Sequence, residues 1–276
     1  MRGVFTAGVL DAFLDKRLKD FDHYYGVSAG ALNLSSYIAG QRGRSQSLYT
    51  NLCIDPRFIS ISRHLKGGNL FDLDWFFEKL NMQYSLDERR FKEQLTERTF
   101  TIVTTNTDTG TPCYQAINSE TTKKALTQTL KATSALPMIY RDPIMVNDTP
   151  MMDGSLSDPM PVLKAIEDGC TDIILVRTRP INARKKSSPS NRMLAWQYRR
   201  QPAIAALIRQ QYALYNESAN QFESLELSDN ITLTQVAPEQ PLSSTRSTRN
   251  RARLVADYHL GYSQGFALAR KLKSIA

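Results

Sequence analysis

The chain has few of the residues that build disulfide frameworks and metal sites. Only three of its 276 residues are cysteines, and only three are histidines. Cys53, Cys113 and Cys170 are widely spaced, and they form neither a CxxC pair nor a Cys/His cluster of zinc spacing. These absences argue against a disulfide-stapled fold and a zinc site. We therefore expect no metal, no cofactor and a reducing, cytoplasmic compartment.

Long apolar runs are also missing from the sequence. No stretch approaches the roughly 20 apolar residues that a membrane-spanning helix needs. The first ten residues resemble the start of a signal peptide, but Asp11 and Asp15 interrupt the apolar run too early. We expect a cytoplasmic protein that at most contacts the inner face of the membrane peripherally.

Net charge is absent from the first two thirds of the chain and concentrated in the last third. Residues 181–276 hold 14 Lys+Arg and 6 Asp+Glu, so the whole net charge of +8 lies there. A basic surface can attract anionic lipid headgroups, although a solvated surface without a partner explains the charge equally well. The basic residues are scattered and form no aromatic-interleaved motif, so no nucleic-acid partner is expected.

What the sequence does contain is an alternation of strand-like and helix-like segments, which predicts an α/β layered fold. Residues 3–19 have the spacing of an amphipathic helix. Helices are expected also at 29–39, 120–135, 160–168, 193–225 and 250–273, and strands at 21–27, 100–105, 114–117, 172–176 and 231–236. A turn at 108–110 should join the second and third strands as a hairpin. Residues 182–192 are polar and basic and indicate a linker.

A Gly-x-Ser-x-Gly motif lies where the first strand should meet a helix, at Gly26-Val27-Ser28-Ala29-Gly30. A tight strand-to-helix turn would make the Ser28 hydroxyl project. Gly26 and Gly30 lack Cβ, so strand and helix could approach closely. The helix N-terminus would favour developing negative charge. Ser28 is the candidate nucleophile, and the competing interpretation is that it only caps the helix.

A serine nucleophile needs a proton acceptor, and the histidines are poorly placed for that role. His23 lies five residues before Ser28 on the same strand, roughly 16 Å away. His259 keeps the Ser…Asp…His order of α/β-hydrolases, giving a possible Ser28–Asp153–His259 triad. That fold, however, lays down several strands before its nucleophile. Asp153 could instead accept the proton directly if burial raised its basicity, although an Asp-Gly pair is also an ordinary turn.

Several segments together resemble the patatin-like phospholipase family. They are Gly26–Gly30, Ser134-Ala135-Leu136-Pro137, and Asp153-Gly154-Ser155 followed by Pro159-Met160-Pro161. Arg2-Gly3 resembles the end of that family's Gly-Gly-Gly-x-Arg/Lys-Gly loop. Thr107-Asp108-Thr109-Gly110 and Tyr262-Ser263-Gln264-Gly265 are similar to features of its bacterial members. The resemblance covers nearly the whole chain.

The resemblance implies a three-layer α/β/α sandwich with a central, mostly parallel sheet and a helical C-terminal extension. It implies a Ser28–Asp153 dyad that needs no histidine and hydrolyses lipid acyl esters through an acyl-enzyme, with Gly154 in the Asp-Gly turn. Arg2 and Gly3 would belong to the loop that holds the oxyanion.

The rest of that glycine-rich loop and its strand would lie upstream of Met1. Residues 1–180 are therefore expected to form an N-terminally incomplete catalytic domain, on which a basic, mostly helical region, 181–276, packs. The rival hypothesis is a non-catalytic or degraded relative that binds anionic lipid surfaces.

Overall fold

The computed structural model describes residues 1–18, 21–137, 139–224 and 230–274. The helices are α1 (Gly3–Asp15), α2 (Ala29–Ile38), α3 (Arg44–Ser47), α4 (Ile61–Leu65), α5 (Leu73–Gln83), α6 (Glu88–Gln94), α7 (Lys123–Ser134), α8 (Val162–Glu167), α9 (Pro189–Gln197), α10 (Pro202–Ser224) and α11 (Arg251–Lys273), with a π-helical segment η1 (Leu48–Leu52) and a 3-10 turn η2 (Gly154–Leu156). The strands are β1 (His23–Val27), β2 (Thr99–Asn106), β3 (Pro112–Ile117), β4 (Ile144–Val146), β5 (Thr149–Asp153), β6 (Asp172–Val176) and β7 (Thr232–Val236). Residues 19 and 225, the predicted ends of two helices, lie outside the described residues.

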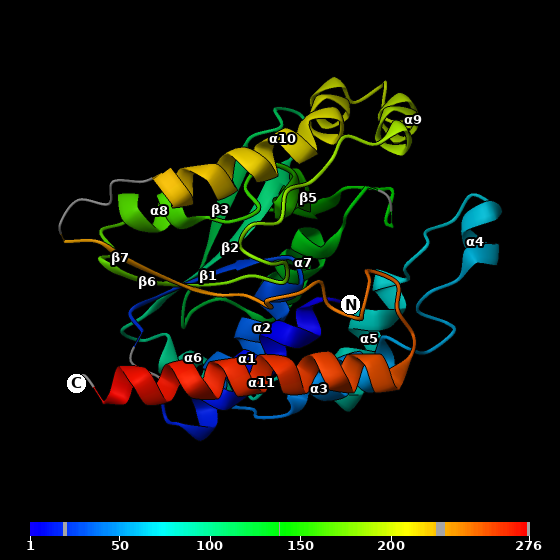
Figure 1. The fold of residues 1–276 in the computed structure, drawn as a ribbon. Coiled ribbons are helices and arrows are strands. Elements are labelled where there is room, and N and C mark those ends of the chain that lie inside the picture. The colour runs from blue at the N-terminus through cyan, green and yellow to red at the C-terminus, as the bar shows by residue number, and fades with distance from the viewer. Residues whose placement is uncertain (19–20, 138, 225–229, 275–276) are drawn as a thin grey trace.

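The α/β class predicted from the sequence is confirmed by a mixed sheet flanked by helices. In the described part of the chain the main sheet has five strands, of which β1, β2 and β4 point the same way and β3 and β5 the opposite way. Strands β6 and β7 pair in parallel as a separate two-stranded sheet. Helices α8 and α10 lie on one side of the strands, and α1, α2 and α7 on the other (Figure 1).

The register of β2 determines which segments meet at the end of β1. Strand β1 runs parallel to β2 up to Val27, which pairs with Val103. Strand β3 occupies the opposite edge of β2. Strand β5 therefore continues along the edge that β1 leaves, where its residue Asp153 pairs with Thr104 of β2. The end of β1 and the end of β5 are therefore neighbours on one edge of β2.

Helix α1 is buried on all sides, whereas its sequence pattern predicted an amphipathic helix over residues 3–19. The helix ends at Asp15, and every residue from Gly3 to Phe13 is buried. The reason is α11, which lies along α1 and covers the face that the pattern left for solvent (Figure 1). Glycines bring the two backbones together: a Cβ on Gly261 would lie 2.0 Å from the Phe5 carbonyl oxygen.

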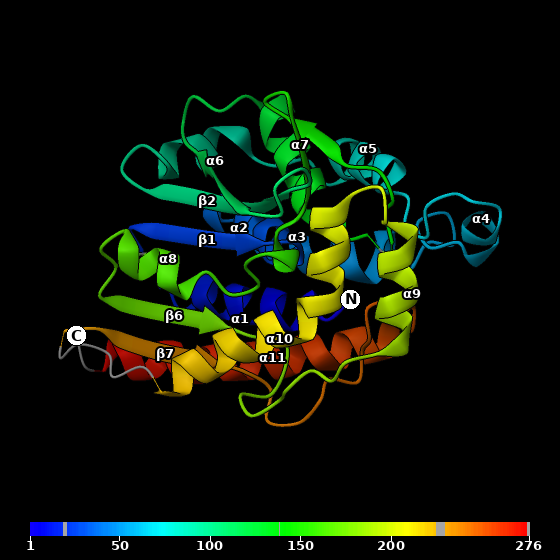
Figure 2. The same ribbon diagram turned by 90° about the horizontal axis from the view of Figure 1, so that it is seen from above.

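Strands β1 and β6 run in the same direction without pairing to each other (Figure 2). Among the described strands, β1 pairs only with β2 and β6 only with β7. A smaller apolar cluster, formed by Met160 and Val162 with Tyr215, Ala219 and Phe222 of α10, packs on β6 and β7. The gap between the two sheets is occupied in part by a cavity that reaches the Gly-x-Ser-x-Gly turn.

Candidate active site

Ser28 occupies a strained turn between β1 and α2. Its φ is 53° and its ψ is −127°, a backbone conformation that costs a non-glycine residue about 1–3 kcal/mol. Its side chain makes no capping hydrogen bond to α2, so the capping interpretation is wrong. The turn exposes the hydroxyl to the cavity instead.

The two glycines of the motif differ in what they do. A Cβ on Gly26 would lie 2.6 Å from the Ala31 Cα, so only glycine lets α2 fold back on β1. A Cβ on Gly30 would meet nothing within 4 Å. The prediction that Gly30 allows close packing is therefore wrong, because the contact between α2 and β1 is made at Ala31 and Gly30 faces open space.

The Ser28 hydroxyl Oγ donates a hydrogen bond of 2.8 Å to the Asp153 carboxylate Oδ2. The other carboxylate oxygen, Oδ1, accepts the Ser155 N–H at 2.9 Å. Asp153 is only 3% exposed, and its burial raises the pKa of the carboxyl group. The hydrogen bonds from Ser155 and Ser28 and the positive charge of Arg246 act in the opposite direction. The result is a buried carboxylate of raised basicity in contact with a serine hydroxyl.

Neighbouring groups fix both partners of this pair. Thr133 accepts the Ser28 N–H at 2.9 Å, and its hydroxyl donates to the Val103 carbonyl at 2.6 Å. A Cβ on Gly154 would lie 2.2 Å from the same carbonyl oxygen, so glycine is required after Asp153. Thr133 was missed in the sequence, although it directly precedes the Ser134–Pro137 run.

Arg2 and Gly3 lie at the N-terminus of α1 and line the same cavity as Ser28 and Asp153. A Cβ on Gly3 would lie 2.9 Å from the Ala29 Cβ, which places the start of α1 beside the residue after Ser28. The first N–H groups of a helix have no partner within the helix and carry its positive dipole end. This end of α1 is therefore suited to hold an oxyanion.

None of the three histidines reaches Ser28. His259 is exposed on α11 and is not among the residues that line the cavity. His23 lines the cavity but pairs with Thr99, with 2.6 Å between Nδ1 and Oγ1. His64 lies in α4. The described residues also contain no group of three or more His, Cys, Asp or Glu side chains that could hold a metal ion.

The cavity has a volume of about 520 Å³ and runs from Ser28 and Asp153 toward the space between β1 and β6. Apolar side chains line much of it. Five basic side chains line it as well: Arg2, Arg177, Arg179, Lys185 and Arg246. We call them the cationic cluster. The cluster could not be predicted from the sequence, because its members are scattered over 245 positions and only Lys185 and Arg246 lie in the basic region 181–276.

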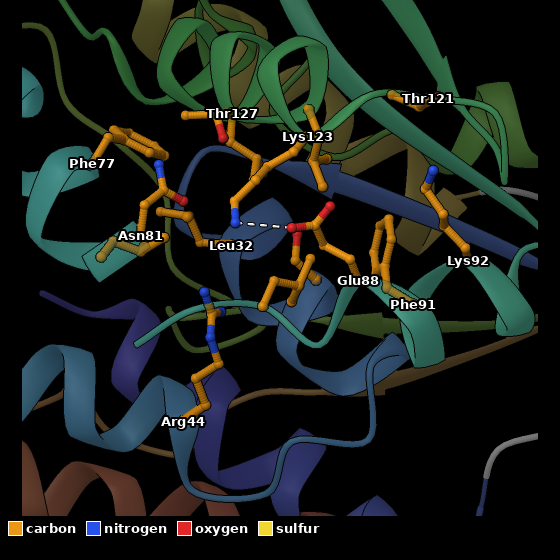
Figure 3. A pocket seen from close by; sticks show the side chains of 15 residues that line it. Leu32, Arg44, Phe77, Asn81, Glu88, Phe91, Lys92, Thr121, Lys123 and Thr127 are labelled. Carbon is orange, nitrogen blue, oxygen red and sulfur yellow. Dashed lines mark ion pairs between the residues drawn. The ribbon is translucent and has the colours of Figure 1, made fainter. Parts of the chain in front are cut away.

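A second cavity lies away from Ser28 and Asp153, between α2, α5, α6 and α7 (Figure 3). Its volume is about 30 Å³, which is room for one or two water molecules. The ion pair between Lys123 and Glu88, 2.8 Å long, crosses it, and its lining includes neither Ser28 nor Asp153. It is too small for an organic ligand.

Comparison with known proteins gave three findings. The family model described as patatin-like phospholipase matches residues 1–166, and a domain of unknown function (DUF6363) matches residues 201–275. The uncharacterized protein YjjU of Escherichia coli (strain K12) is 29% identical over 266 residues, which cover 94% of this chain and 72% of the relative.

Across the part of the chain that the structure describes, no helix is both long enough and apolar enough to span a membrane.

Proposed function

The chain belongs to the patatin-like phospholipase family, and from that premise we propose that it hydrolyses lipid acyl esters with Ser28 as nucleophile and Asp153 as base. The observation that carries the proposal is the 2.8 Å hydrogen bond from Ser28 Oγ to the buried Asp153 carboxylate. A serine hydroxyl attacks only when a base takes its proton, and Asp153 is the one acidic side chain in contact with it among the described residues.

In the first step, Ser28 Oγ attacks the carbonyl carbon of the ester while its proton moves to Asp153 Oδ2. The tetrahedral intermediate then collapses, the bond to the alcohol oxygen breaks, and Asp153 returns the proton to the leaving alcohol. The raised pKa of Asp153 supports both transfers, because a carboxyl group of ordinary pKa is a weak base for a hydroxyl.

In the second step, water attacks the acyl-enzyme. Asp153 takes a proton from the water and returns it to Ser28 Oγ as the carboxylic acid leaves. The oxyanion formed in each step would be held by the N-terminus of α1 at Arg2 and Gly3. In enzymes of this chemistry one such donor changes the rate by about 10²–10³.

The acyl chain would lie on the apolar part of the cavity lining, which includes Leu48, Phe58, Phe71, Leu136 and Ile139. The part between β1 and β6 is less suitable. Hydrocarbon placed there would face two strand edges, and burying backbone N–H and C=O groups against hydrocarbon is unfavourable.

The test is hydrolysis of a short-chain p-nitrophenyl ester by the purified chain. We expect Ser28→Ala and Asp153→Asn each to lower kcat/KM by at least about 10³-fold, as loss of a nucleophile or its base does in other serine hydrolases. Ser187→Ala, an exposed serine outside the cavity, is the matched control and should retain the full rate. An unchanged rate in Ser28→Ala would show that the dyad assignment is wrong.

We also propose that the region 181–276 makes the peripheral contact with anionic membrane. Helix α9 exposes Met193 and Trp196, at 64% and 63%, beside the basic residues Arg192, Arg199 and Arg200. Arg199 stacks on the Trp196 ring at 4.4 Å. An exposed aromatic residue next to cations suits the interface of an anionic bilayer.

Co-sedimentation with vesicles that contain phosphatidylglycerol tests this contact. Trp196→Ser should weaken binding several-fold. Leu260→Ser, which removes an exposed apolar side chain from α11, should not. Equal binding by wild type and Trp196→Ser would show that α9 does not contact the membrane.

A further inference from the structure

Five basic side chains from four separate parts of the chain converge on the cavity that holds Ser28. Arg2 comes from the start of α1, Arg177 and Arg179 follow β6, and Lys185 precedes α9. Arg246 comes from the loop before α11. Lys185 and Arg246 lie close enough for their charges to act on Asp153. The cationic cluster therefore adjoins the reacting groups.

Three members of the cluster contact the side chain of Tyr215, in α10. The Lys185 Nζ lies 4.5 Å from the centre of the ring, and the Arg179 guanidinium carbon lies 5.8 Å from it. Arg177 Nη2 donates to the Tyr215 hydroxyl at 3.2 Å. Cation–π attraction to this ring holds Lys185 and Arg179 at the wall of the cavity that both residues line.

The loops that carry these cations are anchored. The side chain of Asn216 accepts the Lys185 N–H at 2.7 Å and donates to the Lys185 carbonyl at 2.9 Å. The buried carboxylate of Asp257 accepts the N–H groups of Ser243 and Ser244, at 3.1 and 2.8 Å, just before Arg246. Lys185 and Arg246 are thus held at the cavity rather than left to extend into solvent.

Negative charge to balance the cluster is scarce. Among the described side chains, no ion pair within 4 Å involves any of the five cations. The acidic residues of the cavity lining are Asp153, which is bonded to Ser28, and Asp172, at the opposite end of β6 from Arg177. Arg177 is 4% exposed, and its Nε has no hydrogen-bond partner among the described groups.

Such a cluster is unfavourable by itself. Burial and the positive charges of Arg179, Arg246 and Arg2 lower the pKa of Lys185 to about 8. Like charges are held together in this way when an anion bound among them compensates the repulsion, and guanidinium groups bind phosphate oxygens in a bidentate manner.

We propose that the cationic cluster binds the headgroup phosphate of the ester substrate and selects glycerophospholipids whose phosphate carries no cation of its own. The inference rests on the proposed hydrolysis at Ser28 and specifies its substrate class. A choline or ethanolamine headgroup would bring a further positive charge to a site whose nearest carboxylate is already bonded to Ser28. A glycerol headgroup or an unsubstituted phosphate would not.

Binding can be measured without turnover in the Ser28→Ala protein. Calorimetry with dioctanoyl phosphatidylglycerol and dioctanoyl phosphatidylcholine, both below their micelle concentrations, should give at least about ten-fold tighter binding of the phosphatidylglycerol. Adding Lys185→Met should reduce this preference about ten-fold, which corresponds to about 1.4 kcal/mol. Lys186→Met, an exposed neighbour outside the cavity lining, should leave it unchanged.

Arg179→Gln is a second variant, and it should reduce the preference as Lys185→Met does. Equal affinities for the two lipids would overturn the proposal. So would a preference that survives both substitutions, or binding of inorganic phosphate with no preference between the lipids. Because no step of this measurement needs hydrolysis, an inactive wild-type chain that still prefers phosphatidylglycerol would refute the proposed function and leave the headgroup site standing.

Discussion

The ionised carboxylate of Asp153 lowers the stability of the folded protein. Its burial raises the pKa of the carboxyl group, so the ionised form is disfavoured in the folded state and destabilises the protein at neutral pH. A group of this kind contributes stability when it is protonated, and that contribution is lost as the pH rises through its folded-state pKa. Ser28 also lowers the stability of the folded state, because its positive φ is a strained backbone conformation.

The first prediction follows from this charge. Asp153→Asn keeps the shape of the side chain and removes the buried charge, so the free energy of unfolding at pH 7 should rise by about 1 kcal/mol while hydrolysis is lost. Urea denaturation measures the change. Asp108→Asn, at an exposed turn, is the control and should alter neither quantity. A destabilised Asp153→Asn protein would contradict the prediction.

The second prediction concerns pH. Because Asp153 must be ionised to act as a base, kcat/KM for a neutral ester should fall as the pH drops through its pKa, which burial holds above the ordinary value for aspartate. The charge of Arg246 opposes this rise. Arg246→Gln should therefore move the acid limb of the profile to higher pH. Arg251→Gln, outside the cavity, should leave it in place, and an unmoved limb in Arg246→Gln would refute the coupling.

The third prediction concerns Lys185 and the headgroup site. Its ammonium faces Arg2, Arg179, Arg246, Asp153 and the ring of Tyr215, and its pKa is lowered to about 8. Above that pH the ammonium loses its proton and its charge, so the preference for phosphatidylglycerol over phosphatidylcholine should weaken. Calorimetry at pH 7 and pH 9 measures this loss. In the Lys185→Met protein the same change of pH should have little effect.

At the scale of elements, the β1–α2 turn depends on one glycine and not on the other. Gly26→Ala should displace α2, because the new Cβ would meet the Ala31 backbone at 2.6 Å, and should cost about 2 kcal/mol or more together with most of the activity. Gly30→Ala has open space and should stay within about 0.5 kcal/mol of wild type. Urea denaturation and the ester assay compare the two variants. Equal effects would show that the turn is not limited by contact at Gly26.

Local elements could be predicted from the sequence, but their meeting points could not. The β2–β3 hairpin follows from two β-rich runs and the turn at 108–110, and it is confirmed. The approach of Ser28 to Asp153, 125 residues apart, depends on β5 continuing the edge of β2 that β1 leaves. Nothing in the β1 sequence specifies that pairing. The assignment of Asp153 therefore came from family resemblance rather than from periodicity.

For the same reason the residues that surround Ser28 and Asp153 could not be predicted from the sequence. Thr133 reaches Ser28 across 105 residues, and the cationic cluster assembles from four separate parts of the chain. Side chains brought together by tertiary structure leave no spacing in the sequence to detect. The predicted upstream glycine-rich loop and the domain boundary near residue 180 stay predictions.

At the scale of the whole molecule, α1 and α11 hold the two ends of the described chain together. Gly8, Gly261 and Gly265 all face backbone atoms of the opposite helix at distances that exclude a Cβ. Inside this contact, the Tyr258 hydroxyl donates to the Asp11 carboxylate at 2.8 Å. Helix α1 in turn carries Arg2 and Gly3 to the cavity, so α11 supports the site without touching it.

The fifth prediction tests this support. Gly261→Ala should lower the free energy of unfolding by more than about 2 kcal/mol, because the Phe5 carbonyl lies where the Cβ must go. The loss should appear although alanine favours a helix over glycine by about 1 kcal/mol. Ser263→Ala, on the exposed side of α11, is the control. Thermal denaturation of the two variants measures the difference. A Gly261→Ala protein as stable as the control would show that α1 and α11 can move apart without loss of stability.

The contact between α1 and α11 also sets a time order for folding during synthesis. Tyr258 lies 247 residues after Asp11, so α1 leaves the ribosome long before the helix that covers it exists. Until residues 251–273 emerge, one face of an otherwise buried apolar helix stays in water. The nascent chain must therefore wait, with the start of α1 not yet fixed beside Ser28, and would need protection from aggregation meanwhile. A protein built in this way can complete its fold only after residues 251–273 have been synthesised.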